Sequence, residues 1–385
     1  MNISKFVSPE IIFGHGALAQ VGECARRLGA TQVFLVSDPG VVEAGWAEKA
    51  GNSIKEAGLG YVTWAEITPN PKDVEVEAGA EAYLRSGCDA VVAIGGGSAI
   101  DAAKAIAIVA TNGSPIHAYE GVDRIRFPLP PMVTVPSTAG SGSEVSQFSM
   151  IVDTRRQVKM TIVSKSLVPD ICVTDPLLLA TVGNRLTAYT GLEALTHAIE
   201  AYISLAATGF TDVHALAAIR LLAVHLPAAV ANRGNREAKT ALAQASLHAG
   251  LAFSNAILGL VHAIAHQLGG LLDIPQGEAN SLLLPHVLRF NLIAAIDKYI
   301  KIAEALGENI TGLSRMAAAQ KAVEAVEDLC RRVGVKPTLS GLGITKEHVG
   351  QLASNAVNDA CIVTNPRDVT KEDIESILLT ALASE

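Results

Sequence analysis

Two pairs of ionisable side chains at helical spacing are the first sign of chemistry in this sequence. Glu193 and His197 stand four residues apart in GLEALTHAIEAY, and His262 and His266 stand four residues apart in GLVHAIAHQLGG. Residues at i and i+4 lie on one face of a helix. A carboxylate and imidazoles on facing helices can bind a divalent metal ion. The alternative is that these side chains satisfy one another inside an apolar core.

A glycine-rich turn follows an uninterrupted apolar run. The segment 90–107 reads AVVAIGGGSAIDAAKAIA, which predicts a buried strand, a GGGS turn and a helix. Glycines let backbone N–H groups approach an anion, and a helix N-terminus adds unpaired donors. Ser98 can cap that helix or donate to a phosphate. Together with a second such loop, PSTAGSGSE at 136–144, the turn favours a nucleotide site. A tight turn that uses Gly for its geometry alone is the alternative.

An aspartate at the end of the first predicted strand bears on the choice of nucleotide. VFLVSDPG places Asp38 at that carboxyl end. A carboxylate there can accept a hydrogen bond from a ribose 2′-OH and repels a 2′-phosphate, so Asp38 predicts NAD rather than NADP. The alternative is an Asp that begins a turn before Pro39. No GxGxxG follows this strand, so the usual dinucleotide fingerprint is missing.

The elements that must position these residues change character near residue 180. Before it, β-branched runs alternate with helical stretches, which predicts parallel βαβ units. The expected strands are VFLVSD (33–38), YVTWAEI (61–67), AVVAIGG (90–96), MVTVPS (132–137) and ICVTD (171–175). The expected helices between them are 19–28, 42–57, 74–86 and 99–111. The polar DTRRQ inside MIVDTRRQVKMTIV (150–163) predicts a hairpin.

After residue 185 the pattern is Ala/Leu-rich and helical in period. The expected helices are 186–203, 212–230, 236–257, 259–272, 279–296 and 315–333. We therefore expect two domains: an α/β dinucleotide-binding domain with a parallel sheet at 1–182, and an all-α metal and substrate domain at 183–385. The short join at 176–185 predicts that they pack around a cleft.

The composition excludes several classes of protein. A chain with 49% hydrophobic and 18% charged residues has the apolar surface that disordered chains lack. A net charge of −8 argues against nucleic acid and anionic membranes as partners. Five scattered Cys without CxxC indicate a reducing compartment, and the N-terminus has no secretory pattern, so we expect a cytoplasmic protein. The most apolar segment, 250–274, carries Asn, Gln and two His, which predicts burial inside protein rather than in a membrane.

The remaining candidate side chains favour structural roles. Seven other histidines lack ligand spacing to a partner: His15, His117, His214, His225, His248, His286 and His348. Cys361 has no neighbouring His or basic residue in the sequence, which predicts a packed thiol rather than a nucleophile.

Several of these segments together resemble the iron-containing (group III) alcohol dehydrogenase family, in a shared order that spans nearly the whole chain. They are TPNP (68–71), GGGSAIDAAKA, PSTAGSGSEVS, VTDP, GLEALTHAIEAY, FSNAILGLVHAIAHQLGG, SLLLPH and CIVTNPR. The resemblance implies an NAD(P)-binding N-terminal domain, a helical C-terminal domain and an active site in the cleft. It also implies interconversion of a small primary alcohol and its aldehyde, in a homodimer or higher homo-oligomer.

The resemblance further assigns roles to individual positions. The residues that match NAD contacts are Asp38, Asn70, Gly96, Gly97, Ser98, Ser137, Thr138, Phe148, Lys159 and Leu178. His266 matches a histidine near the nicotinamide that is implicated in proton relay, and Phe253 matches an aromatic residue that lines the substrate pocket.

The metal pattern departs from that of the family. The family has Asp-x-x-x-His, a His, and a His in a Pro-His-Gly turn, where this chain has Glu193, His197, His262 and Gln276. We expect Fe²⁺ or Zn²⁺ bound by this set as a Lewis acid. Two alternatives stay open: a metal-independent carbonyl reductase of the same fold with His266 as the main acid, and a non-catalytic nucleotide-binding relative.

Overall fold

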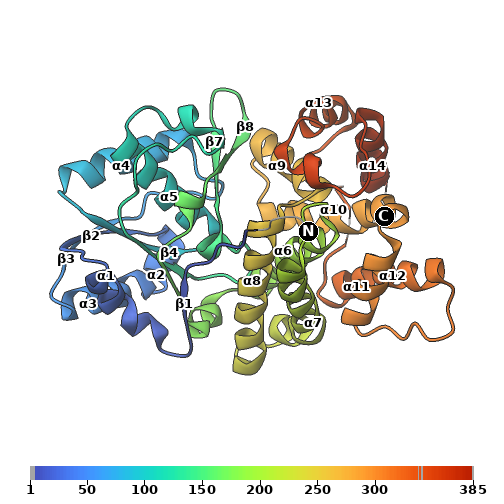
Figure 1. Cartoon of the computed structure of the whole chain (residues 1–385), viewed down its shortest axis with the longest axis horizontal. Helices are drawn as coiled ribbons and strands as arrows, with labels where there is room; N and C mark the ends of the chain where they lie inside the picture. Colours follow the sequence, from blue (N-terminus) through green and yellow to red (C-terminus); the bar gives the residue numbers. More distant parts are fainter. Residues whose placement is uncertain (1–4, 337, 340, 384–385) are drawn as a thin grey trace. The chain divides into compact units, whose positions relative to one another are not determined.

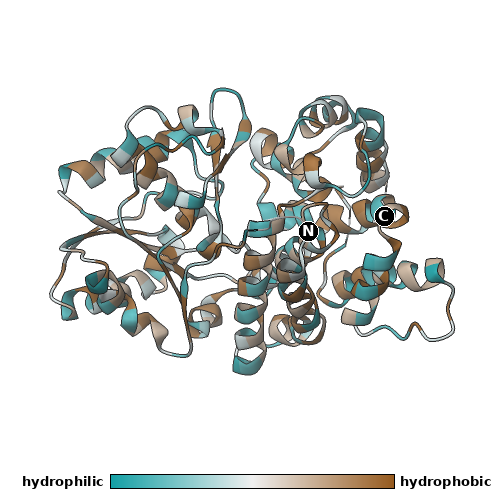
Figure 2. Ribbon diagram, in the orientation of Figure 1, coloured by the Kyte–Doolittle hydropathy of each residue, from teal (hydrophilic) through white to brown (hydrophobic). Residues whose placement is uncertain are grey.

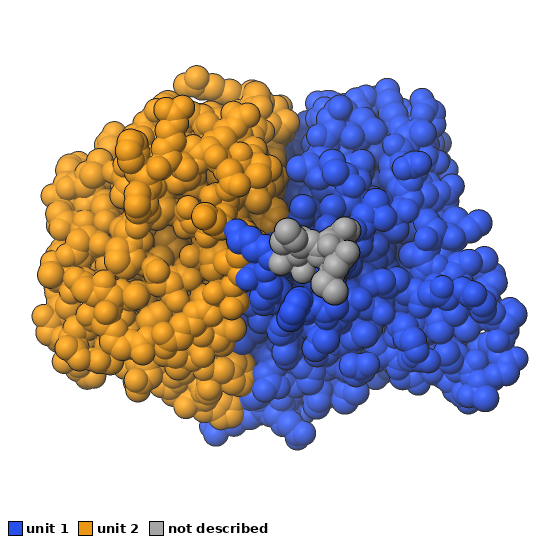
Figure 3. Space-filling model, viewed as in Figure 1, with its two compact units in different colours: residues 1–6, 183–385 blue, residues 7–182 orange. Residues whose placement is uncertain are grey.

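The computed structural model describes residues 5–336, 338–339 and 341–383. The chain forms two compact units, Val7–Val182 and Met1–Phe6 with Gly183–Glu385 (Figure 3). The sequence predicts that the first six residues belong to the α/β domain. Phe6 instead belongs to the helical unit because its ring stacks on His214, at a centroid distance of 5.5 Å.

The first unit is built on a parallel sheet, which confirms the predicted α/β class. The six strands follow the order β1-β9-β6-β4-β2-β3. Their bounds are β1 Glu10–Phe13, β2 Gln32–Val36, β3 Gly60–Trp64, β4 Ala90–Gly95, β6 Met132–Pro136 and β9 Ile171–Thr174. A second sheet, β5-β8-β7, contains the predicted hairpin, with β5 Gly121–Val122, β7 Phe148–Asp153 and β8 Val158–Val163.

Helices cover both faces of the six-stranded sheet (Figure 1). Their bounds are α1 Val21–Arg27, α2 Pro39–Glu43, α3 Trp46–Glu56, α4 Asp73–Arg85 and α5 Gly97–Asn112. Alternate strand residues point to opposite faces. Accordingly Phe34 and Val91 pack in one cluster with α4 and α5, whereas Leu35 and Val92 pack in another with α1 and α3. Two apolar faces explain the uninterrupted hydrophobic runs of these strands, which Figure 2 shows in brown.

The second unit is helical, as the sequence predicts. Its helices are α6 Asn184–Ile203, α7 Gly209–Ala231, α8 Arg236–Ala256, α9 Leu260–Leu272, α10 Gln276–Asn291, α11 Ile296–Ala305, α12 Arg315–Arg332, α13 Lys346–Ala356 and α14 Lys371–Ala383. Short 3-10 turns occur at η1 Ala17–Gln20, η2 Ile116–Tyr119, η3 Ser143–Val145, η4 Lys165–Leu167, η5 Pro176–Thr181, η6 Leu292–Ala294 and η7 Ala360–Thr364. The sequence prediction missed α11, α13, α14 and strand β1.

Breaks in the backbone divide two stretches of helix; the first break is a difference from the prediction, and the second agrees with the separate helices expected at 236–257 and 259–272. The helix expected at 42–57 is divided by Gly45, which adopts φ 78° between α2 and α3. The apolar segment 250–274 spans the end of α8 and all of α9, which bend by 100° after Ile257 adopts φ 62°. Both parts of this segment are largely buried, as expected.

One helix of the described chain, α7, is long and apolar enough to cross a membrane. The α8–α9 pair would count as a second only if the bent pair formed one span. Core helices of globular proteins meet the same criterion, so this is weak evidence for a membrane span.

Candidate active site and cofactor site

The predicted phosphate-binding residues gather at the carboxyl ends of three adjacent strands. Asp38 follows β2, the GGGS turn follows β4, and Ser137 with Thr138 follow β6. The direction of winding changes here, because β2 leads to β3 on one side while β4 leads to β6 on the other. Open α/β sheets bind ligands in the crevice at such a switch point.

Close packing explains why the turn is built from glycine. A Cβ on Gly97 would lie 2.7 Å from the Cβ of Ser141, and a Cβ on Gly95 would lie 2.5 Å from the Cβ of Ala99. Helix α5 starts at Gly97, with Gly96 as its N-cap, so no side chain caps it there. The cap role predicted for Ser98 is therefore wrong, because Ser98 already lies in the first helical turn. Its other role, donation to a phosphate, stays a prediction.

Of the two roles that the sequence left open for Asp38, the structure shows the turn-forming one, and ribose binding stays a prediction. Its Oδ1 accepts a hydrogen bond from the backbone N–H of Val41 at 3.0 Å, so it caps α2. Its Oδ2 lies 2.9 Å from the position that a Cβ on Gly95 would take, so the carboxylate also lies beside the end of β4. A turn-forming Asp is thus placed next to the GGGS turn.

Four other predicted cofactor residues, Asn70, Phe148, Lys159 and Leu178, lie outside the two glycine-rich loops but in the same unit. Lys159 donates to Oδ1 of Asn70 at 2.9 Å, which joins β8 to the loop before α4. The carbonyl of Phe148 accepts from Lys104 at 3.0 Å. Leu178 is fully buried in the core cluster beside α1 and α3.

A buried group of charged side chains lies beneath the GGGS turn. Lys104 on α5 is fully buried, and its ammonium donates to the carbonyls of Ser143, Ser146 and Phe148. These hydrogen bonds fix the segment that joins the second glycine-rich loop to β7. Burial lowers the pKa of Lys104 to about 8. Burial also raises the pKa of Glu144 to about 7. Within the part of the chain that the structure describes, Oε2 of Glu144 has no hydrogen-bond partner.

In the helical unit, the predicted metal and catalytic residues come from α6, α8, α9 and α10. The His197 ring stacks on His262 at 4.6 Å and on Phe253 at 4.4 Å, between centroids. His262 and His266 are 6.0 Å apart by the same measure. Oε2 of Glu193 lies 3.0 Å from where a Cβ on Gly277 would be, next to Gln276. The structure thus brings all six predicted residues into one cluster, and all but Gln276 are buried.

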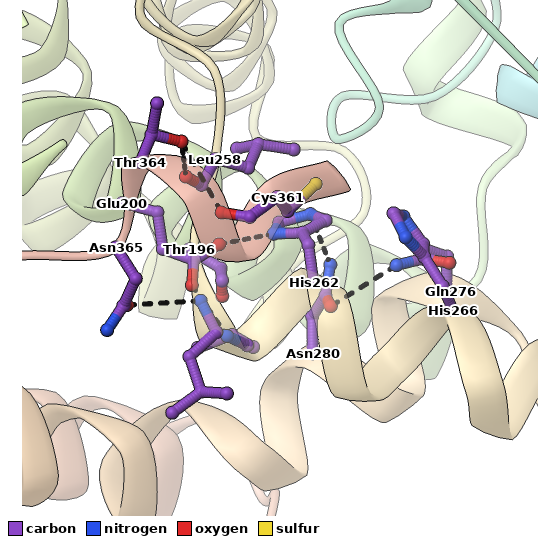
Figure 4. Close-up of polar contacts among 12 residues, drawn as sticks. Thr196, Glu200, Leu258, His262, His266, Gln276, Asn280, Cys361, Thr364 and Asn365 are labelled. Atoms are coloured by element: carbon purple, nitrogen blue, oxygen red, sulfur yellow. Dashed lines mark hydrogen bonds and ion pairs between the residues drawn. The ribbon is translucent and has the colours of Figure 1, made fainter. Parts of the chain in front are cut away.

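Two hydrogen bonds fix His262. Its Nδ1 lies 2.5 Å from Oε2 of Glu200, and its Nε2 lies 2.9 Å from Nδ2 of Asn280 (Figure 4). An amide nitrogen can only donate, so Nε2 accepts, and the ring proton is on Nδ1. A carboxylate on the far nitrogen is the usual partner of a metal-binding histidine. Burial raises the pKa of Glu200 to about 7.

A second buried pair fixes His266. Its Nδ1 lies 2.9 Å from Oδ2 of Asp359, which is also 3.4 Å from Nε2 of Gln267. Burial opposes ionisation of Asp359, but His266 and the N–H of Cys361 outweigh it and lower the pKa of Asp359. The ionised carboxylate accepts a hydrogen bond from Nδ1–H of His266, so the other ring nitrogen, Nε2, is the one that can exchange a proton.

Cys361 behaves as the packed thiol that the sequence predicts. Burial raises the pKa of this thiol well above its ordinary value, so it is protonated. The fold nevertheless brings His266 and Asp359 close to it, although no His neighbours Cys361 in the sequence.

The chemistry of the predicted metal ligands suits a divalent ion. One carboxylate, two imidazoles and an amide oxygen can bind Fe²⁺ or Zn²⁺, and the proton on Nδ1 leaves a lone pair on Nε2 of His262. In the described residues, groups of three His, Cys or carboxylate donors within 4.8 Å occur at His266–Asp359–Cys361 and at Asp73–His117–Asp153. Glu193, His197 and His262 are not such a group. An ion bound by this set must therefore draw its donors closer together.

Three supporting residues were missed by sequence reasoning. Glu200 lies seven residues after Glu193, and Asn280 lies four after Gln276, so each extends a helical face that was already singled out. Asp359 is separated from His266 by 93 positions, and no local spacing links them.

Comparison with known proteins agrees with this arrangement. A family model described as "Iron-containing alcohol dehydrogenase" matches residues 8–176, and one described as "Fe-containing alcohol dehydrogenase family, C-terminal" matches 187–382. An NAD-dependent methanol dehydrogenase of Bacillus methanolicus is 41% identical over 98% of this chain and 99% of its own length. A 1,3-propanediol dehydrogenase of Klebsiella pneumoniae is 43% identical over 96% of each chain. A crystal structure of 1,3-propanediol oxidoreductase superposes with a TM-score of 0.96 at 42% identity, covering 99% of this chain and 100% of that one.

A parallel sheet with glycine-rich turns at its switch point and a helical unit with clustered histidines agree with the nucleotide-linked oxidoreductases that the chain matches. The chain belongs to the iron-containing alcohol dehydrogenase family. The resemblance seen in its motifs is thereby confirmed, as is its class, an oxidoreductase that acts on alcohols.

Proposed function

We propose that this protein interconverts a small primary alcohol and its aldehyde with NAD, assisted by a divalent ion in the histidine cluster. The observation that carries the proposal is the hydrogen-bonded frame of that cluster. Glu200 binds Nδ1 of His262, so that the lone pair is on Nε2, and Asp359 binds Nδ1 of His266, so that Nε2 is the nitrogen that exchanges a proton. A core that merely buried its histidines would not require two carboxylates in these positions.

The proposed roles divide between the two units. Glu193, His197, His262 and Gln276 would hold the ion, which when bound polarises the substrate oxygen. NAD carries the hydride. His266 moves the alcohol proton at Nε2, and Asp359 keeps its ring oriented and stabilises the charged form. Phe253 stacks on His197 and gives the pocket an apolar wall.

The cofactor residues named above support the choice of NAD. The first turn of α5 offers backbone donors to the pyrophosphate, and Asp38 beside Gly95 supplies the carboxylate for a ribose hydroxyl. A 2′-phosphate would meet that negative charge.

The decisive experiment is reduction of a panel of short aldehydes with NADH, before and after chelation, with metal analysis of the same preparation. We expect activity that chelators remove and Fe²⁺ or Zn²⁺ restores. Activity that ignores chelators in a metal-free protein would establish the metal-independent reductase. NADH binding without any turnover would establish a non-catalytic relative.

We also propose a cytoplasmic homodimer or higher homo-oligomer. All five cysteines are free and buried, which suits a reducing compartment. Sedimentation analysis tests the oligomer, and cell fractionation of the native source tests the location.

A further inference from the structure

The side chain that faces the lone pair of His262 is Asn280, which lies one turn beyond Gln276 on α10. Asn280 is fully buried, and its Nδ2 lies 2.9 Å from Nε2 of His262. Its Oδ1 accepts a hydrogen bond from Nε2 of Gln276 at 3.4 Å. Figure 4 shows the three side chains in a row, with Asn280 in the middle.

This order has a consequence for metal binding. Zinc bound to a histidine nitrogen sits about 2.0–2.1 Å from it, along the lone pair. The Asn280 amide lies on that lone pair, 2.9 Å from Nε2, which leaves no room for an ion between them. An ion bound to His262 must therefore displace the Asn280 amide, which then stands beside it, whereas Gln276 lies beyond Asn280. Gln276 is also partly exposed, so water competes for its weak amide donor.

The Asn280 amide can present either of its ends. Rotation of the amide by half a turn exchanges Nδ2 and Oδ1 and places an oxygen, rather than a donor N–H, beside His262. Gln276 carries both a donor and an acceptor, so it can hydrogen-bond to Asn280 in either orientation.

We propose that Asn280, through Oδ1, is the neutral oxygen ligand of the ion, and that Gln276 acts by positioning Asn280. This inference rests on the proposed metal-assisted function. It replaces one member of the ligand set taken from the sequence, and it moves the fourth donor one helical turn deeper into the unit.

The test is Co²⁺ titration of the metal-stripped full-length protein, read by the visible spectrum and by calorimetry. Asn280→Ala should weaken Co²⁺ binding about 100-fold and change the spectrum. Gln276→Ala removes only a positioning contact, so it should weaken binding about tenfold or less and keep the spectrum. Asn280→Asp should tighten binding, because a carboxylate replaces an amide oxygen at the same length.

A matched control separates ligation from loss of packing. Asn291 is also fully buried on α10, and it pairs with Asn365 instead of a histidine. Asn291→Ala should lower thermal stability but leave Co²⁺ affinity unchanged. Equal weakening in both Asn→Ala variants would overturn the inference, and so would an unchanged affinity in Asn280→Asp, which also covers the case that Asn280→Ala fails to fold.

The outcomes distinguish failure of this ligand assignment from failure of the proposed metal-assisted function. If wild type binds Co²⁺ and Gln276→Ala weakens binding more than Asn280→Ala does, the ligand assignment is wrong and the metal-assisted function stands. If wild type binds neither Co²⁺, Fe²⁺ nor Zn²⁺ and is active, both are wrong.

Discussion

The turn after β4 and the histidine cluster of the helical unit present their binding groups in opposite ways. In the turn, the groups that would meet a phosphate are backbone N–H donors, and the side chains are reduced to hydrogen atoms because Ser141 and Ala99 leave no room. In the cluster, the helical backbone is already hydrogen-bonded, so side chains must do the binding.

The supporting residues differ in the same way. Beneath the turn, the buried Lys104 ammonium binds three backbone carbonyls between the neighbouring loop and the start of β7. In the cluster, carboxylates hold imidazole rings. Added atoms should therefore damage the first region, whereas removed functional groups should damage the second.

The largest effect is expected when a functional group is removed from the cluster. His266→Ala should lower kcat about 10²–10⁴-fold, because a positioned acid–base group is lost. Metal content should change little, since His266 is assigned to proton transfer. Steady-state kinetics and metal analysis check this, with His225→Ala on α7 as the control. Full activity with lost metal would mean that His266 is a ligand instead.

Replacing the buried carboxyl of Glu144 by an amide tests the charged residues beneath the GGGS turn. The pKa of Glu144 is about 7 in the folded protein, whereas an unburied glutamate has a pKa of 4.5. The folded state therefore binds more protons than the unfolded state between these pH values, and Glu144 makes the protein less stable as pH rises through this window. The total is up to about 3 kcal/mol. Glu144→Gln should remove this loss.

Urea unfolding at pH 5 and pH 7 measures how much free energy of unfolding is lost as the pH rises. The difference between the two pH values should shrink in Glu144→Gln and stay unchanged in the exposed control Glu56→Gln. Equal pH dependence in wild type and Glu144→Gln would mean that Glu144 is already ionised in the fold.

Added atoms in the turn should weaken NADH binding. Gly97→Val introduces a Cβ 2.7 Å from Ser141 and blocks approach to the pyrophosphate. Gly97 is not among the glycines with positive φ, so crowding rather than backbone strain causes the effect. Overpacking of about 1–3 kcal/mol corresponds to about 5–150-fold in affinity. Fluorescence titration measures it, and Gly209→Ala at the start of α7, where an added Cβ meets nothing within 4 Å, is the control. Unchanged affinity would remove the GGGS turn from the site.

A donor added to the cluster should strengthen it. Gln276→His places an imidazole where the family has one, and imidazole is a better ligand than an amide for Fe²⁺ or Zn²⁺. We expect about tenfold tighter binding, since this is a typical effect of a change near a metal. Metal content after identical dialysis compares the two proteins. Weaker retention by the variant would indicate that Glu193, with its longer reach, already fills that position.

The sequence predicted the regions of regular pattern and missed the long-range contacts. Unbroken runs such as AVVAI predicted strands covered on both faces, and the period of GLEALTHAIEAY predicted the face that carries Glu193 and His197. The edge strand β1 was missed because it is only four residues long, and its apolar run, IIF, is too short to stand out. Helices α13 and α14 were missed as well, although α14 carries the apolar run ILLTALA.

In the site, spacing along a helix could identify ligands but not their partners. Glu200 and Asn280 share faces with predicted residues, and a longer search of the same faces would have found them. The partnership of Asp359 with His266 depends on how the C-terminal segment packs against α9, which no local pattern encodes.

The smallest effect is expected where a side chain does serve the turn. Asp38→Asn keeps the length of the side chain and an oxygen for the Val41 N–H, but removes the charge, so the cap of α2 should persist. Two like charges about 4 Å apart in water repel by about 1 kcal/mol, so the preference for NADH over NADPH should fall about fivefold. Asp38→Gly should relax it similarly. The ratio of kcat/KM for the two cofactors measures the change, with Asp175→Asn, which caps η5 in the same unit, as the control. Equal use of NADPH and NADH by wild type would contradict the role of Asp38, and the cofactor choice would then be made by the backbone of the turn alone.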